Sequence, residues 1–444
     1  MKFRELISAL EKGGELIDVK KPVSPEFEAA SVIFAAGERP IRFQKIGSSS
    51  YPLVAGLCST RALVAQGLGI APDRLLGTLS KAIDAPKPPD VFKKASCQEV
   101  VEETVDLDSL PLLKYFEGDG GNYITSAVAV IRDPDTGRNA SFHRLMQIGK
   151  NRFTGRLVEG RQTHSTYQKL LKRGEELEIA FCIGNSTAVM LGSSVSPPEE
   201  VDELAIANAL ESTPLVKCKT KDIEVPADSE FILEGRITAE QTQEGPFVDL
   251  TETRDIVRTQ PVIEIDKITH RKNAVFQTLL PGKREHKLLM GMPREPTIFR
   301  EVNAVCECRN VVLTPGGCSW LHAVVQICKK RDDEPMKAIA AAFRGHRSLK
   351  HCVIVDSDID INDPQDVEWA IATRFRAGKK LVLLENQPSS SLDPMADKPP
   401  GGKATVSKMG LDATMPLSDP TKPVAKFKRV EYRPAKVRDY ASDR

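Results

Sequence analysis

The last third of the chain holds three consecutive runs, HCVIVDSDIDI (351–361), DPQDVEWAIATRF (363–375) and KKLVLLEN (379–386). The first and third runs are rich in Val, Ile and Leu, as buried strands are. In the second run Asp363 suits the cap of a helix and Pro364 its first turn. A strand, a helix and a strand at this spacing predict a βαβ unit and therefore a parallel sheet. Beyond about residue 390 the sequence is polar and rich in Pro and Gly, so we expect a tail on the surface or against another subunit.

The start of the chain shows helix and strand signals in turn. Apolar residues recur at helical spacing in FRELISAL (3–10), and Gly13 and Gly14 predict the end of this helix. The run ELIDV (15–19) then predicts a first strand, and residues 26–36 predict a second helix. A proline-rich connection, DAPKPPDVF (84–92), leads us to place the first domain boundary at about residue 105.

The middle of the chain, roughly 106–300, is dominated by strand signals. They occur in four runs, SAVAVIRD (126–133), LEIAFCIG (177–184), DIEVPADSEFILEGRI (222–237) and VIEIDKITH (262–270). Turn signals such as DPDTG (133–137) separate them, and a helix is expected over 200–210 with acidic residues at its start. This pattern predicts a sheet or barrel with a few helices.

Composition excludes several classes of protein. The 444 residues are 41% hydrophobic and 28% charged, as in ordinary globular proteins, and the net charge of +1 argues against a nucleic-acid binder. No stretch approaches the roughly 20 apolar residues of a membrane span, and acidic residues interrupt the start, so we expect a cytoplasmic protein. The nine cysteines are scattered and odd in number, which argues against a disulfide framework. Their only close pair, Cys306 and Cys308, lacks the second pair of a zinc site.

The stretch Glu244-Gly-Pro-Phe-Val-Asp249 is the most informative for chemistry. Two acids lie five residues apart around a Gly-Pro turn, in which Gly245 permits a tight bend and Pro246 stiffens it. Two carboxyl groups held in one site push their pKa values apart, so that one can stay protonated as an acid. The alternative is a surface turn with two solvated acids.

A second stretch, Asn139-Ala-Ser-Phe-His-Arg144, is expected to be a strand. Arg144 and Phe142 would then share one face, and Asn139, Ser141 and His143 the other. The guanidinium fork of Arg144 suits a substrate carboxylate, although an arginine in such a pattern, taken alone, is more often the partner in a surface salt bridge. His164 and Glu203 would not be singled out by pattern alone.

Together these segments resemble the UbiD family of reversible, non-oxidative decarboxylases, in the family's order along most of the chain. Asn139 and Arg144 match its N-x-x-x-x-R segment, His164 follows Thr154-Gly155, and Glu203 opens the helix before LVKCKTKDIEVPADSEFILEG. The runs EGPFVD, VDSDIDINDPQDVEWAIATR and SLDP with KMGLDAT match as well. The resemblance implies an α/β (α+β) fold. Its domains would be an N-terminal α/β domain (1–105), a central flavin-binding split β-barrel (106–300) and a C-terminal α/β oligomerisation domain with a tail (301–444).

The resemblance also implies a site built on prenylated FMN. Asn139, His164 and Glu203 would bind Mn²⁺ or Mg²⁺, which holds the flavin phosphate, and this mixture of oxygen and imidazole ligands suits manganese. The residues that would line the cofactor are Asn139, Ser141, His143, Arg144, Ser193, Ser194 and Lys350, with a potassium site at the two adjacent serines. The expected partners are a UbiX-type flavin prenyltransferase that supplies the cofactor and further copies of the chain in a homodimer or homohexamer.

The catalytic residues implied by the resemblance are Arg144, Glu244 and Asp249. Arg144 would orient the substrate carboxylate, Glu244 would fix Arg144, and Asp249 would deliver the proton that replaces carbon dioxide. Decarboxylation at a vinylic carbon leaves a carbanion that side chains cannot hold, so the flavin would act as the electron sink.

The chain departs from the family pattern where it reads EGPFVDLTETRD instead of EGPFGDHTGYY. With only 5% aromatic residues it offers little stacking surface for a large aromatic or polyprenyl acid. In this and in its length it resembles the compact archaeal branch, which implies decarboxylation of trans-anhydromevalonate 5-phosphate to isopentenyl phosphate. The phosphate would need cations, for which the candidates are Lys283, Arg284, Lys287 and Arg294, unless these form a solvated basic loop. The alternatives are an aromatic-acid or polyprenyl-hydroxybenzoate decarboxylase of the family and a non-catalytic flavin- or metal-binding homologue.

Overall fold

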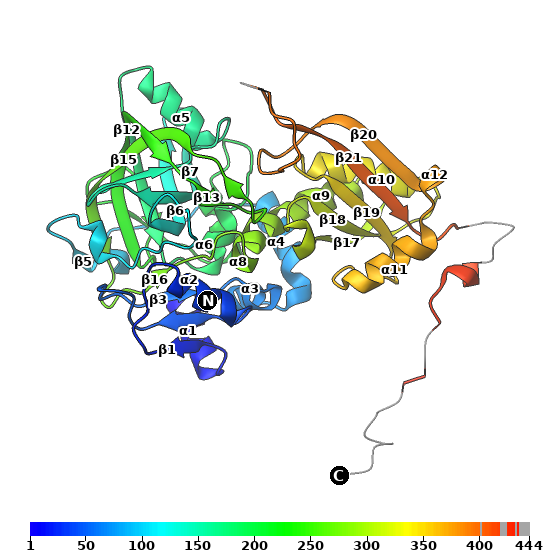
Figure 1. Ribbon diagram of the computed structural model, residues 1–444, viewed down its shortest axis with the longest axis horizontal. Coiled ribbons are helices and arrows are strands. Elements are labelled where there is room, and N and C mark those ends of the chain that lie inside the picture. The colour runs from blue at the N-terminus through cyan, green and yellow to red at the C-terminus, as the bar shows by residue number, and fades with distance from the viewer. Residues whose placement is uncertain (400–401, 418–423, 431–432, 435–444) are drawn as a thin grey trace, which may run out of the picture.

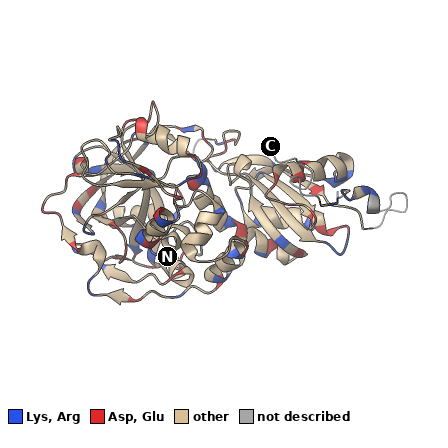
Figure 2. Ribbon diagram, turned by 90° about the horizontal axis from the view of Figure 1, so that it is seen from below, with Lys and Arg blue, Asp and Glu red and all other residues tan. Residues whose placement is uncertain are grey.

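The computed structural model describes residues 1–399, 402–417, 424–430 and 433–434. Figure 1 shows a small N-terminal part packed beneath a β-barrel, and a C-terminal sheet with its helices beside them. Acidic and basic residues are interspersed over all three parts in the view of Figure 2. No helix within the described ranges is long and apolar enough to cross a membrane. The predicted α/β (α+β) fold is confirmed.

The N-terminal part is a four-stranded sheet covered by helices. Its strands, in spatial order, are β1 (Ile17–Val19), β2 (Ile41–Phe43), β3 (Leu53–Ala55) and β16 (Phe276–Gln277). The helices are α1 (Phe3–Lys12), α2 (Glu28–Ala36), α3 (Arg61–Leu68) and α4 (Leu75–Asp84). The predicted helix of the first residues is confirmed: its apolar stripe is buried, and Gly13 caps it.

The barrel is an antiparallel sheet closed on itself. Its six strands are β12 (Phe231–Glu244), β9 (Leu177–Ile183), β6 (Tyr123–Asp133), β7 (Gly137–Gln147), β8 (Arg152–Gly155) and β15 (Arg258–His270), and pairing of the first with the last closes the ring. A short strand, β5 (Val100–Val101), pairs antiparallel with the last residues of β15. Alternate residues of β6 point to opposite faces: Ala129 and Ile131 join the core that continues into the N-terminal sheet, and Val128 and Val130 pack under helices.

Helices and small sheets surround the barrel. The helices are α5 (Gln162–Leu171), α6 (Thr187–Gly192) and α7 (Glu203–Leu210). A second sheet contains β4 (Val91–Phe92), β10 (Leu215–Lys217) and β11 (Glu224–Pro226), and a hairpin contains β13 (Phe247–Val248) and β14 (Arg254–Asp255). Short 3-10 turns occur at Pro72–Arg74, Ser96–Gln98, Leu107–Ser109, Pro315–Gly317 and Val424–Phe427.

The C-terminal part is a five-stranded mixed sheet with helices against it. The order is β17 (Glu307–Leu313), β18 (His322–Cys328), β19 (His351–Asp356), β21 (Thr405–Ala413) and β20 (Leu381–Pro388). The helices are α9 (Glu295–Asn303), α10 (Glu334–Gly345), α11 (Pro364–Arg374) and α12 (Ala377–Lys380). Helix α8 (Arg284–Gly291) and the 3-10 turn η4 (Met292–Arg294) lead into α9 from the barrel.

Two expectations for this region were wrong. The strands of the predicted βαβ unit are β19 and β20, but β20 pairs antiparallel with β21, which itself runs parallel to β19. The parallel unit lies one step earlier, in β18, α10 and β19. The surface tail was expected from about residue 390, which is too early. Strand β21 follows that point, lies inside the sheet and places its Gly410 against Ile339.

Later residues of the tail were predicted to lie on the surface or against another subunit. Within the described ones, the Arg429 guanidinium stands 4.4 Å from the Trp369 ring centroid and pairs with Asp366 of α11 at 2.7 Å. The residues of the expected tail at 400–401, 418–423, 431–432 and 435–444 fall outside the described ranges.

The predicted domain boundaries at 105 and 300 remain predictions, and two short strands cross the first of these divisions. Residues 100–101 pair with the barrel strand β15, and residues 276–277 complete the N-terminal sheet by pairing parallel with β3. The parts therefore share strands as well as side-chain contacts.

Candidate functional site

The centre of the candidate site is Arg144, which β7 places among three carboxylates. Its Nε and Nη2 donate to the two oxygens of Glu244, both at 2.9 Å. Nη1 donates to Asp249 Oδ2 at 2.8 Å, and Nη2 also donates to Asp255 Oδ2 at 3.0 Å. The guanidinium lies 4.7 Å from the centroid of the Phe247 ring. Arg144 and the two acids predicted from the Gly-Pro turn are thus in direct contact, with a third acid that the sequence did not suggest.

The Gly-Pro turn brings its two acids to Arg144, as predicted. Glu244 ends β12 and is fully buried, the Gly245–Pro246 peptide is cis, and Gly245 has a φ of 95°. A residue from another segment, Gly120, holds the turn in place, since its N–H donates to Pro246 O at 2.9 Å. A Cβ atom on Gly120 would lie only 2.2 Å from Gly245 O, so this close approach requires glycine.

Asp255 joins Arg144 to two further arginines. Its Oδ2 lies 2.9 Å from Arg156 Nη1 and 2.6 Å from Arg258 Nη1. Burial raises the pKa of Asp255, but the hydrogen bond from Arg258 and the charges of Arg156 and Arg144 lower it more, so the net pKa is below its ordinary value. The only sequence signal was a charged pair in TRDIV, which a solvated turn would show as well.

The charge of Arg144 is secured by its neighbours. Burial alone would lower the pKa of this guanidinium, but the hydrogen bonds and charge of Glu244, followed by the charges of Asp249 and Asp255, raise it. Burial and the nearby Glu244 also raise the pKa of Tyr123, whose hydroxyl lies 3.4 Å from Glu244 Oε1. Arg144 therefore stays positively charged among these carboxylates.

The predicted metal ligands are partly brought together. Asn139 Nδ2 donates to Glu203 Oε1 at 2.8 Å, and the backbone N–H of Ala140 donates to Glu203 Oε2 at 2.9 Å. Burial raises the pKa of Glu203 to about 8. The buried Oδ1 of Asn139 has no hydrogen-bond partner. His164 is half-buried in the first turn of α5, and the described residues show no hydrogen bond from it to either of the other two.

The predicted cofactor residues lie in three places: on β7, at the end of α6 and in the C-terminal part. Ser141 and His143 stay together on β7, where Ser141 Oγ and Thr163 Oγ1 lie 3.3 and 3.4 Å from His143 Nε2, and burial lowers the pKa of His143 to about 4. Ser193 is buried and its Oγ lacks a partner, whereas Ser194 Oγ donates to Met190 O at 2.7 Å.

Lys350 lies in the C-terminal part, where its Nζ is 3.0 Å from Asp393. The unpartnered Oδ1 of Asn139, next to the buried Glu203 carboxylate, fits a bound cation, because buried polar atoms without partners are rare in folded proteins.

Three of the four basic candidates for a phosphate site are paired with acids. Lys283 and Lys287 both pair with Glu252, and Arg284 pairs with Glu38. The segment is the helix α8 and its 3-10 extension, not a loop. Of the four, Arg294 alone forms no ion pair with an acid in the described ranges.

Comparison with known proteins identifies the family of this chain. Residues 7–83, 90–284 and 287–413 match the N-terminal, Rift-related and C-terminal domains of the UbiD family, described as 3-octaprenyl-4-hydroxybenzoate carboxy-lyase. An anhydromevalonate phosphate decarboxylase from Methanothermobacter thermautotrophicus is 42% identical over 94% of this chain and 97% of its own. One from Methanosarcina mazei is 40% identical with the same coverage.

Solved structures share the fold. The UbiD-class enzyme HmfF from Pelotomaculum thermopropionicum, in complex with FMN, superimposes with a TM-score of 0.94 at 37% identity and covers 99% of this chain and 100% of its own. An evolved dimeric form of that enzyme is in complex with prFMN, with a TM-score of 0.90 at 36% identity and the same coverage. A vanillic acid decarboxylase from Sedimentibacter hydroxybenzoicus, in closed form, has a TM-score of 0.83 at 26% identity and covers 99% of this chain and 97% of its own.

Proposed function

Because the chain belongs to the UbiD family of decarboxylases, we propose that it removes carbon dioxide from trans-anhydromevalonate 5-phosphate to give isopentenyl phosphate. The observation that carries this substrate is the identity of 42% and 40% to two archaeal anhydromevalonate phosphate decarboxylases over 94% of the chain. The contact of Arg144 with Glu244 and Asp249 supports the reaction, since it combines a carboxylate-binding cation with an acid.

In this proposal Arg144 binds the substrate carboxylate and Glu244 holds Arg144 in position. Glu244 is suited to that role because it is fully buried and engages the guanidinium through both oxygens. Asp249 accepts from Nη1, the outer edge of the same fork. A substrate carboxylate would take this place. Asp249, released from Arg144, would take up a proton from solvent and deliver it to the carbon that loses carbon dioxide.

The proposal includes prenylated FMN and a divalent metal, Mn²⁺ or Mg²⁺. Asn139 and Glu203 would bind the metal with His164, and the unpartnered Ser193 Oγ suits an accompanying potassium ion. Ser141, His143 and Ser194 would line the flavin, and Lys350 would reach its phosphate after leaving Asp393. When bound, the prenylated flavin supplies the electron sink that the vinylic carbanion needs. A UbiX-type prenyltransferase would supply it, and the chain would assemble as a homodimer or homohexamer.

Metal binding is testable apart from turnover. Glu203→Gln should reduce the Mn²⁺ content of the purified protein, measured by mass spectrometry, by at least about tenfold, as loss of a charged ligand generally does. Glu224→Gln is a matched control, because Glu224 pairs with Arg138 at 3.0 Å on the neighbouring surface. Equal metal content in the two variants would contradict the proposed ligand set.

The substrate is tested on protein produced anaerobically together with a flavin prenyltransferase. Carbon dioxide release is compared between trans-anhydromevalonate 5-phosphate and a panel of aromatic and cinnamic acids. Release from the phosphate alone is the expected result. Release from aromatic acids alone would favour the aromatic-acid alternative, and no release despite bound cofactor would favour a non-catalytic homologue.

A further inference from the structure

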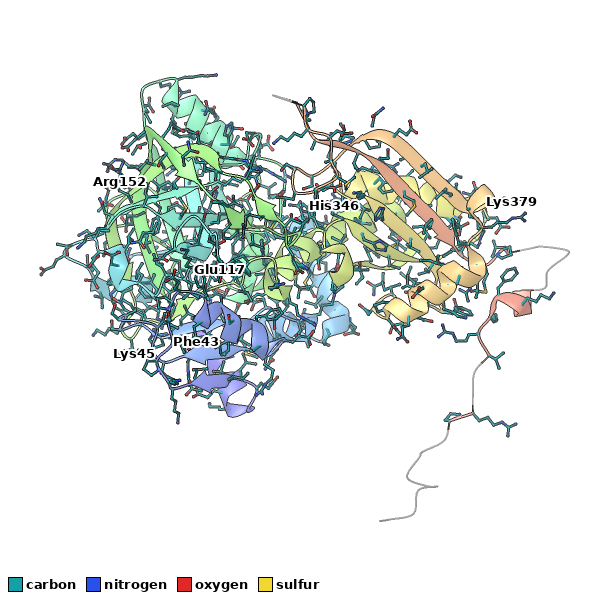
Figure 3. All side chains as sticks on the ribbon, viewed as in Figure 1. Phe43, Lys45, Glu117, Arg152, His346 and Lys379 are labelled. Atoms are coloured by element: carbon teal, nitrogen blue, oxygen red, sulfur yellow. The ribbon has the colours of Figure 1, made fainter. Side chains whose placement is uncertain are left out.

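A second group of basic residues lies between the barrel and the C-terminal part. Arg161 precedes α5, and Arg294 ends η4, which leads into α9. Both guanidinium groups donate to one hydroxyl, Ser196 Oγ, with Arg161 Nη1 at 3.2 Å. Arg294 also stands 5.6 Å from the Trp320 ring centroid, and Trp320 packs edge-on against His346. Figure 3 shows His346 on the side of the C-terminal part that is nearer the barrel.

No acid neutralises these cations within the described ranges. Neither Arg161 nor Arg294 forms an ion pair with a described carboxylate, although every other arginine of the active-site region does. Burial, followed by the charge of Arg161, lowers the pKa of Arg294 to about 10. His346 offers no counter-charge either, because burial, and then the charge of Arg294, lowers its pKa to about 3.

The group also has donors without acceptors. Nε of Arg294 is buried and has no hydrogen-bond partner. Trp320 is 4% exposed, and its indole N–H is likewise unpartnered. Guanidinium groups that lack a counter-ion and buried N–H groups that lack acceptors each cost folding free energy, so a fold that retains both is suited to an anion that satisfies them.

The position of the group connects it to the proposed reaction. Arg161 lies three residues before His164, and Ser196 lies two residues after Ser194. On the other side, α8 and η4 join Arg294 to His286, whose pKa is lowered by burial, with smaller effects of the charges of Asp249 and Arg144. Eight residues of helix span about 12 Å, which places Arg294 at that order of distance from His286.

We propose that Arg161 and Arg294, with Ser196 between them, bind the dianion of a phosphate monoester, to which the Trp320 N–H is a further donor. Two guanidinium forks and a hydroxyl match the several oxygens of a phosphate. This assignment rests on the proposed function, which offers two phosphate monoesters, the 5-phosphate of the substrate and the ribityl phosphate of the flavin. Both present the same chemistry to the site.

The test compares Arg294→Met and Arg161→Met with Arg300→Met, a matched control on α9 whose exposed guanidinium pairs with Asp84. Inorganic phosphate is titrated into each purified protein by calorimetry, and thermal melting verifies folding. Both site variants should lose affinity for phosphate by about 10- to 100-fold, as expected for a hydrogen bond to a charged group, and the control should not. Arg294→Lys, which keeps a cation, should recover part of the affinity.

Two further measurements identify the source of the phosphate. If it is the substrate's, KM rises in the site variants while flavin content and kcat stay near those of the parent protein. If it is the flavin's, affinity for FMN falls and KM is unchanged. Phosphate and FMN affinities equal to the parent's in both folded variants, with unchanged KM, would overturn the proposal. Because phosphate and FMN binding need no turnover, these results are informative even if the parent protein does not act on the proposed acid.

Discussion

Replacing Asp255 by Asn tests whether this buried carboxylate holds the arginine cluster together. Its Oδ2 lies 3.0 Å from Arg144, 2.9 Å from Arg156 and 2.6 Å from Arg258. At an effective dielectric constant of about 20, each contact is worth roughly 6 kcal/mol before desolvation is subtracted. Repulsion among the guanidinium groups and lost hydration cancel most of that sum. We therefore expect the free energy of unfolding to fall by about 3 to 5 kcal/mol, as when one partner of a buried ion pair is removed.

Activity should fall less than stability in Asp255→Asn. Arg144 keeps both hydrogen bonds to Glu244 and the one to Asp249, so its orientation should be largely preserved. We expect kcat to drop by about tenfold, which corresponds to roughly 1.4 kcal/mol in the barrier. The assays are urea unfolding followed by circular dichroism, and carbon dioxide release from the proposed substrate.

A matched control for Asp255→Asn is Asp266→Asn. Asp266 also pairs with an arginine and a lysine, Arg236 and Lys221, but its side chain is 28% exposed, and its removal should cost only about 1 kcal/mol. Because the pKa of Asp255 is below its ordinary value, its contribution to stability is complete above about pH 4 and is lost as the pH falls through the lowered value. The reasoning fails if Asp255→Asn and Asp266→Asn unfold at the same urea concentration.

Three further substitutions test the rest of the site. Asp249→Asn should lower kcat by at least about 100-fold while the spectrum of bound flavin is kept, and surviving turnover would mean that another group donates the proton. Gly120→Ala should melt well below the parent protein because its Cβ would lie 2.2 Å from Gly245 O, whereas Gly77→Ala in α4, with open space around it, should melt at or slightly above it. His143→Gln should flatten the pH dependence of the melting temperature. The ordinary pKa of a histidine is about 6.5, and burial lowers that of His143 to about 4, so the parent protein should lose stability as the pH falls from the first value towards the second. Parallel curves for the two proteins would contradict the burial of His143 in its neutral form.

The sequence predicted those parts of the site that follow from local backbone rules. The Gly-Pro turn between Glu244 and Asp249 and the strand that carries Arg144 were visible in the local sequence, and both have the expected form. The contact with Gly120 that holds the turn comes from a distant segment and was not visible there. Asp255 escaped prediction because its role arises from Arg144 and Arg156, which come close to it only when segments about 100 residues away fold against the hairpin. A charged residue in a hairpin gives no local sign of burial.

The order and direction of the strands could likewise not be predicted from local sequence patterns. The runs at 351–361 and 379–386 do form strands. Nothing in these runs or in the residues that connect them predicts that residues 405–413 lie between the two strands in the sheet. The basic candidates near residue 285 show the same limit, because the acids that neutralise them, Glu38 and Glu252, come from a distant helix end and a distant hairpin. Charge counted along a segment does not show which charges are already paired.

The strand β16 has a consequence for how the chain is made. Its two residues, 276–277, supply the last strand of a sheet whose other three strands end at residue 55. During synthesis the edge of β3 therefore stays open until the barrel strands that precede β16 have left the ribosome. An open sheet edge is a template for pairing with other chains. The nascent chain thus passes through a long interval in which its first-made sheet needs protection, and a fragment ending near residue 105 would carry that exposed edge permanently.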